Sequence, residues 1–253
     1  MTPQPPVIAL GELDAALASA GYAVLDAAGS AALAGLPRDT LSSWAGHWNE
    51  LPPDHYLKDG GRYRRRRHGS FVVRRDTVYR VPHRAHWQPV SYNALHGGIE
   101  RWFDPLPEAL VADLAWSHLL MALARRADTL RAQDRWYTEA HLFRIDTAGG
   151  IGRPTPEGAH RDGVELVAVM LVARHNVKGG ETRVFDAAGP QGQRFTLTEP
   201  GSTLLLDDER VIHESTPIQP IDSAQPAWRD TLVITLRREG FQDPPLLKSQ
   251  ADA

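Results

Sequence analysis

Residues 158–163 read Gly-Ala-His-Arg-Asp-Gly, which places His160 and Asp162 two positions apart. On an extended segment, residues i and i+2 point to the same face, so both side chains can reach one ion. A third candidate ligand, His213, lies in the segment Val-Ile-His-Glu-Ser-Thr-Pro at 211–217. Two imidazoles and one carboxylate on one side of a metal leave its other positions open, which suits Fe(II) that binds a co-substrate and O2 together. The sequence therefore predicts a metal site formed by His160, Asp162 and His213.

The composition narrows the available metal chemistry and the classes of partner. The chain has 253 residues and no cysteine, which excludes disulfides, Cys-ligated zinc, thiolate catalysis and iron–sulfur clusters. With 28 basic and 31 acidic residues the formal charge is -3, so we expect neither nucleic acid nor a membrane as a partner. The first residues do not resemble a secretory signal, and no apolar run approaches the roughly 18 residues of a membrane span. We therefore expect a soluble, cytoplasmic protein.

Apolar periodicity predicts helices in the first half of the chain and strands in the second. Helical patterns cover residues 10–20 and 106–132, and a short strand is expected at 22–25. Beyond about residue 136, short β-rich runs alternate with turns that contain Gly or Pro. These runs lie at 141–145, 164–172, 182–185, 194–197, 202–206 and 231–236.

This pattern favours one domain over residues 1–253. Residues 1–135 are expected to form a mostly helical support and lid region, and residues 136–240 a β core that carries the metal site. Residues 241–253 are expected to be a tail. The predicted fold class is therefore mainly β with flanking helices (α+β), as a sandwich or barrel covered by a helical layer.

The surroundings of the three candidate ligands resemble a known superfamily. A Gly-Gly-Glu-Thr turn at 179–182 and a Pro-Gly turn at 200–201 precede His213, and Arg229 begins the next strand. This order is similar to that of the Fe(II)/2-oxoglutarate-dependent dioxygenases. Three segments look more specifically like the bacterial L-isoleucine-dioxygenase-like family, from about residue 141 to 237. They are PTPEGAHRDG at 154–163, RHNVKGGE at 174–181 and RDTLVIT at 229–235.

The resemblance implies a fold, an activity and cofactors. The fold is a double-stranded β-helix (jelly-roll, cupin-like) core. The activity is that of a dioxygenase that uses Fe(II), 2-oxoglutarate and O2. It would hydroxylate or sulfoxidise a small substrate, in this family a free L-amino acid, with release of succinate and CO2.

Two other classes of protein remain open. One is a non-catalytic β-barrel that binds a small molecule, although such a binder has no need for open iron positions. The other is a metal-dependent isomerase or hydrolase on a cupin-like barrel, which needs a further carboxylate near the metal. Glu214 is the local candidate for that carboxylate, and it adjoins His213 on a strand, so we expect it to face away.

The far carboxylate of 2-oxoglutarate needs a buried cation, and the planar fork of Arg can pair both of its oxygens. The resemblance assigns this role to Arg229, which could instead pair on the surface with one of three acidic residues, Asp207, Asp208 or Asp230. The hydroxyls of Thr182 and Ser202 could add contacts to a carboxylate or be ordinary sheet residues.

Further candidates lie on the strand before the metal motif and in a basic run. His141 and Arg144 could bind the cofactor or the substrate, but strand alternation allows at most one of them to point inward. The run Arg62–Arg67 would usually be a solvated face or a nucleic-acid patch. Because the chain is slightly acidic, we expect the run instead to bind a substrate carboxylate or to attach the N-terminal region to the barrel. The other histidines show no spacing that indicates a second site; they are His47, His55, His68, His83, His86, His96, His118 and His175.

Overall fold

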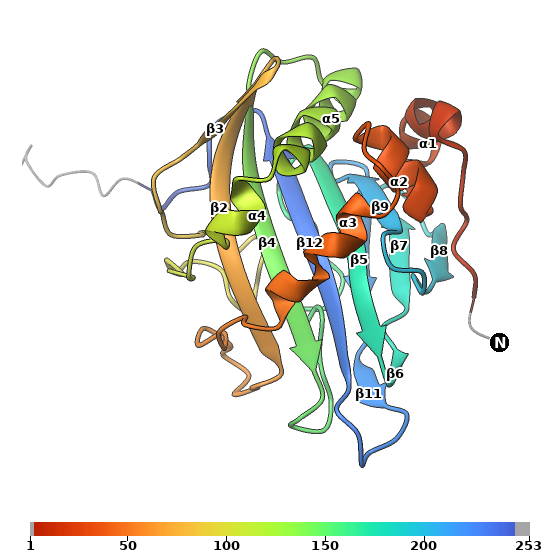
Figure 1. Ribbon diagram of the computed structural model, residues 1–253, viewed down its shortest axis with the longest axis vertical. Helices are drawn as coiled ribbons and strands as arrows, with labels where there is room; N and C mark the ends of the chain where they lie inside the picture. The colour runs from red at the N-terminus through yellow and green to blue at the C-terminus, as the bar shows by residue number, and fades with distance from the viewer. Residues whose placement is uncertain (1–2, 246–253) are drawn as a thin grey trace, which may run out of the picture.

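The computed structural model, which describes residues 3–245, is built around one large antiparallel sheet (Figure 1). Residues 246–253 of the predicted tail lie outside the described residues. The order of the seven strands is β1 (Tyr22–Leu25), β9 (Thr203–Asp207), β5 (Leu166–His175), β12 (Trp228–Arg237), β4 (Trp136–Asp146), β2 (Arg64–Arg74) and β3 (Thr77–Arg80).

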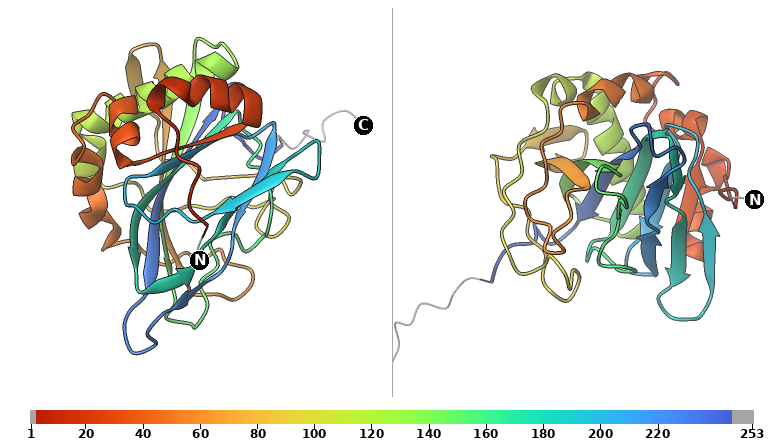
Figure 2. Two further views of the ribbon diagram at one scale, coloured as in Figure 1. Left: turned by 90° about the vertical axis from the view of Figure 1, so that its right-hand side faces the viewer. Right: turned by 90° about the horizontal axis from the view of Figure 1, so that it is seen from below.

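Two smaller antiparallel sheets complete the β structure (Figure 2). The three-stranded sheet runs β10 (Val211–Ser215), β7 (Thr182–Asp186), β8 (Gly192–Phe195), and the two-stranded sheet pairs β11 (Ile218–Pro220) with β6 (Val177–Gly179). An apolar cluster joins the large sheet to the three-stranded one, with Val167 and Leu204 on one side and Val184 and Val211 on the other. The predicted class, mainly β with flanking helices and a jelly-roll core, is confirmed.

Helices cover the outer face of the large sheet (Figure 1). They are α1 (Leu13–Ala20), α2 (Ala27–Leu33), α3 (Thr40–Ser43), α4 (Glu108–Val111) and α5 (Leu114–Leu130), with 3₁₀ helices at Leu10–Glu12 and Trp44–Trp48. The helix expected over 106–132 is interrupted because Asp113 takes an extended conformation and its carboxylate caps α5, accepting the Ala115 N–H at 2.9 Å. None of these described helices has the length and apolar character needed to cross a membrane.

The long strands β4 and β12 are largely buried on both faces, and side-chain alternation along them separates two environments. On β4 and β12, Leu142 and Leu232 pack into the core shared with the helices. The neighbouring His141 and Val233 point the other way and line a cavity. The N-terminal half thus supplies β1, β2 and β3 to the sheet in addition to the helices.

Candidate active site

The structure brings the three predicted ligands together beside β10. His213 lies on β10, and the loop that carries His160 is joined to it by a pair of backbone hydrogen bonds of 3.1 and 2.9 Å. The Nε2 atoms of His160 and His213 lie 3.7 and 3.8 Å from the two carboxylate oxygens of Asp162. The candidate ligand atoms all lie within 4.8 Å of one another. This donor set of two imidazole nitrogens and one carboxylate fits Fe(II).

Contacts behind these side chains set their orientation. The Nδ1–H of His160 donates to the Gly158 carbonyl at 3.0 Å, which leaves Nε2 as the atom that can bind a metal. Burial opposes a charge on this ring, but the hydrogen bond and charge of Asp162 outweigh burial and raise the pKa of His160 to about 10. A bound cation would take the place of that proton.

Two residues that the sequence analysis did not place at the metal site, Asp208 and Gln88, form hydrogen bonds with Asp162. Asp208 accepts the backbone N–H groups of Asp162, Gly163 and Val164 at 3.1, 2.8 and 3.2 Å. The side-chain amide of Gln88 donates to Asp162 Oδ1 at 3.3 Å. Neither has a local motif, since Asp208 follows β9 and Gln88 lies in a segment without helix or strand.

The candidate metal ligands face a cavity lined by the inner surface of the large sheet. Its open space, counting the mouth that opens to solvent, is about 960 Å³. Arg229 lines it and is only 3% exposed. Its Nε has no hydrogen-bond partner among the described residues. Burial, followed by the Arg174 guanidinium, lowers the pKa of Arg229 to about 10, so it stays cationic at neutral pH.

A surface pairing of Arg229 with an acidic neighbour does not occur in the described residues. Asp230 pairs with Arg144 instead, at 2.8 and 2.7 Å, on the opposite face of the sheet. Of the two candidates on β4, therefore, His141 lines the cavity and Arg144 does not. Thr182 and Ser202 are buried but are not among the residues that line the cavity.

A second carboxylate lies beside the triad, but it is not Glu214. Glu214 faces away and binds Arg183 at 3.2 Å. Glu157 lines the cavity, and its Oε1 lies 3.6 Å from His160 Nε2. The Oε2 atom of Glu157 is buried without a partner among residues 3–245.

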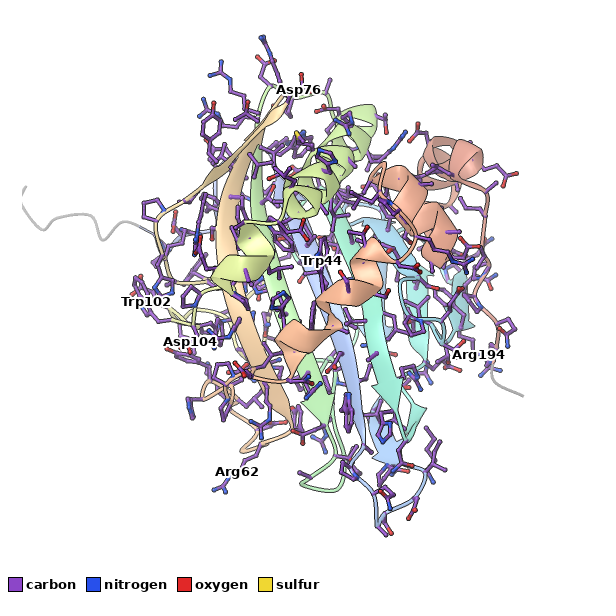
Figure 3. All side chains as sticks on the ribbon, in the orientation of Figure 1. Trp44, Arg62, Asp76, Trp102, Asp104 and Arg194 are labelled. Carbon is purple, nitrogen blue, oxygen red and sulfur yellow. The ribbon has the colours of Figure 1, made fainter. Side chains whose placement is uncertain are left out.

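The basic run is for the most part a strand, and its side chains alternate. Arg64 and Arg66 on β2 are buried and line the cavity. Arg65 is exposed, and Arg62, before the strand, points out from the protein (Figure 3). Because side chains alternate along a strand, Arg64 and Arg66 line the cavity while Arg65 between them faces the other way.

The structure contains a second group of histidines that the spacing along the sequence did not indicate. His68, His86, Glu139 and His141 form a buried group whose potential ligand atoms also lie within 4.8 Å of one another. Pairing of β2 with β4 sets His68 opposite His141, a register that residue spacing alone does not reveal. Glu139 accepts hydrogen bonds from His68 at 3.0 Å and His86 at 3.3 Å.

Arginines surround this second group and disfavour a metal there. Arg84 lies 3.4 Å from Glu139, and Arg66 donates to His141 Nδ1 at 2.8 Å. Burial lowers the pKa of His86 to about 3, and burial with the Arg66 charge lowers the pKa of His141. The rings are therefore neutral at neutral pH. Of this hydrogen-bonded group, His86, Glu139 and His141 line the cavity.

The chain matches a family model, one named relative and several solved structures. The family model described as 2OG-Fe dioxygenase matches residues 45–235. The 3(1)-hydroxy-L-isoleucine 4-dioxygenase of Pantoea ananatis (strain AJ13355) is 25% identical over 156 residues, covering 60% of this chain and 63% of that protein. The chain thus spans less than two thirds of the length of that relative.

Solved structures agree in fold. A bsmA homolog from Methylobium petroleophilum PM1 is 54% identical, with a TM-score of 0.90 over 95% of this chain and 98% of the other. IDO from Bacillus thuringiensis is 17% identical, with a TM-score of 0.72 over 92% and 96% of the two chains. At that identity the second likeness shows the fold alone.

Proposed function

This chain belongs to the 2OG-Fe dioxygenase family, and from that premise we propose that it hydroxylates or sulfoxidises a free L-amino acid. The family uses Fe(II), 2-oxoglutarate and O2. When bound, the iron and the co-substrate supply the activation of O2, with release of succinate and CO2. The protein's own residues then bind, orient and shield the reactants.

The observation that carries the proposal is the placing of the triad and Arg229 in one cavity. His160, Asp162 and His213 would hold the iron on one side and leave positions open on the other. Arg229, on the facing sheet, has a buried guanidinium nitrogen without a partner among residues 3–245. A buried cation of this kind would pair with the far carboxylate of 2-oxoglutarate.

The proposal that the substrate is an amino acid is supported by the name of one relative. The relative from Pantoea ananatis is named for a hydroxylated isoleucine, and we extend the class, a free L-amino acid, to this chain. The carbon or sulfur that is oxidised would depend on the shape of the cavity near the triad.

Formation of succinate in the presence of Fe(II), 2-oxoglutarate and a panel of free L-amino acids tests this function. We expect formation that depends on the amino acid in the wild type and none in H160A or D162A. H118A removes an exposed histidine and should retain full turnover. Full succinate formation by H160A or D162A would refute the assignment of the site. A wild type that turns over no 2-oxoglutarate, but isomerises or hydrolyses a substrate, would favour a role for Glu157 as a base.

A further inference from the structure

The cavity holds a second cationic group, separate from Arg229. Arg64 on β2 and Arg229 on β12 are both aligned with Ile145 of β4, from opposite sides. Two strand spacings separate them, which corresponds to about 10 Å between their backbones. A carboxylate bound at Arg229 would therefore leave the Arg64 side of the cavity free for a different anion.

Three arginines meet on that side. Arg66 is held in place by His141 and by stacking over the Phe103 ring, whose centroid lies 3.8 Å away. Arg64 donates to Asp54 at 2.7 Å, and Arg101 donates to the side-chain oxygen of Gln88, Oε1, at 2.9 Å. These hydrogen bonds hold the guanidinium groups of Arg64 and Arg101 in place.

Arg64 and Arg101 each have a further nitrogen that no described residue pairs with. Arg64 Nη2 and Arg101 Nε are buried and have no hydrogen-bond partner within residues 3–245. Buried donors without partners are rare in native proteins and indicate a missing acceptor. Burial, followed by the charge of Arg64, lowers the pKa of Arg101 to about 10, so Arg101 remains cationic at neutral pH. This side of the cavity therefore favours an anion.

An acceptor without a partner in the described part of the chain lines the same cavity as these donors. Glu157 Oε2 is buried and unpartnered in the described part of the chain. The negative charge of Glu157 acts on Arg101, yet no ion pair within 4.0 Å joins the two among the described residues. Both side chains line the same cavity, so a gap separates two atoms that have no partner among the described residues, Arg101 Nε and Glu157 Oε2.

We propose that this gap binds the head group of a free α-amino acid, with the carboxylate on Arg101 and Arg64 and the ammonium on Glu157. This inference rests on the proposed function and specifies its substrate class as a zwitterion with both groups unmodified. Because Glu157 lies beside His160, the α-carbon would be held next to the triad with the side chain free to reach it. N-acylated amino acids and amino acid amides would each lose one charged contact, and a residue inside a peptide would lose both.

Binding to the anaerobic Fe(II)–2-oxoglutarate protein, measured by calorimetry, tests the proposal. The probes are L-isoleucine, L-leucine, L-valine and L-methionine, together with the isoleucine analogues 3-methylpentanoate, which lacks the ammonium, and L-isoleucinamide, which lacks the carboxylate. We expect an amino acid to bind about tenfold to a hundredfold more tightly than either analogue, as charged hydrogen bonds require.

Two variants separate the two ends of the head group. E157Q should weaken the binding of the amino acid by about tenfold or more and leave the affinity for 3-methylpentanoate unchanged. R101K should weaken the binding of both the amino acid and 3-methylpentanoate, because the lysine ammonium cannot replace the guanidinium fork. The affinity for L-isoleucinamide should not change. The controls E214Q and R144K make the same replacements at residues that face away from the cavity, and both should bind as the wild type does.

The outcomes also separate this proposal from the function on which it rests. If the iron–2-oxoglutarate charge-transfer band forms but no amino acid binds, or if E157Q weakens acid and amino acid equally, the head-group site is refuted and the oxygenase assignment stands. Loss of the band in E157Q would assign Glu157 to the iron instead. If the wild type shows no band, the proposed function fails and the head-group site fails with it.

Discussion

Asp208 holds the backbone of Asp162, accepting its N–H at 3.1 Å while also accepting those of the next two residues. The orientation of the candidate carboxylate ligand therefore depends on a residue that does not face the metal. D208N keeps the side-chain shape but replaces one acceptor oxygen with an NH2 donor. We expect iron affinity to fall by about tenfold to a hundredfold, as measured by competition with a chelator. D207N, one residue away, should bind iron as the wild type does, and equal losses in both variants would contradict the role of Asp208.

Arg229 is expected to determine the affinity for 2-oxoglutarate. R229M removes the buried guanidinium with little change in volume, and we expect the Kd for 2-oxoglutarate to rise by about tenfold to a hundredfold. Titration of the Fe(II) protein under nitrogen measures this Kd. Pyruvate, which has no far carboxylate, should bind wild type and R229M equally weakly. A variant that keeps wild-type affinity for 2-oxoglutarate would show that another cation binds the far carboxylate.

The buried pair of Asp54 with Arg64 predicts an acid-sensitive contribution to stability. Burial opposes ionisation, but the charges of Arg64 and Arg66 outweigh it and hold the pKa of Asp54 below its ordinary value. The stabilisation is then complete above the unfolded-state pKa near 4. It is lost as the pH falls through the lower folded-state pKa.

D54N should therefore lower the free energy of unfolding at pH 7 by about 3–5 kcal/mol, because it leaves a buried arginine unpaired. The difference from the wild type should shrink as the pH falls below about 4. Urea denaturation at several pH values measures both effects. D14N breaks an exposed pair with Arg126 and should cost less than about 1 kcal/mol. A difference for D54N that does not change with pH would contradict the assignment.

The group formed by His68, His86, Glu139 and His141 is expected to hold no metal. The surrounding arginines oppose a dication, so elemental analysis of the iron-loaded protein should find about one iron per chain. H141A should retain that iron, and H160A should lose it. Two metals per chain in the wild type, or loss of one of them in H141A, would establish a second metal site.

The predictable parts of the site are those with a local sequence signal. His160 and Asp162 share a short extended segment, and His213 and Arg229 follow turns whose order is informative. The β-rich texture after residue 136 likewise predicted the strands of the core, and Gly21 ends α1 in a left-handed conformation, φ 76°, as a glycine stop signal should.

The rest of the cavity depends on strand pairing and on loops. Arg64 and Arg66 face inward only because β2 pairs with β4 in a particular register, and a shift of one residue would have exposed them. Gln88 and Arg101 lie in the segment 81–107, which has no helix or strand and therefore no periodicity from which to predict its direction. Glu157 was visible in the motif, but its contact with the cavity is a property of the folded loop.

The central claim is that His160, Asp162 and His213 bind Fe(II) together with 2-oxoglutarate. The most direct measurement is the anaerobic addition of 2-oxoglutarate to the Fe(II) protein, followed by visible absorption. We expect a metal-to-ligand charge-transfer band in the wild type that saturates at one 2-oxoglutarate per iron and is absent in D162A and H160A. A wild type that binds Fe(II) but develops no band, or a D162A variant with an unchanged band, would contradict the account.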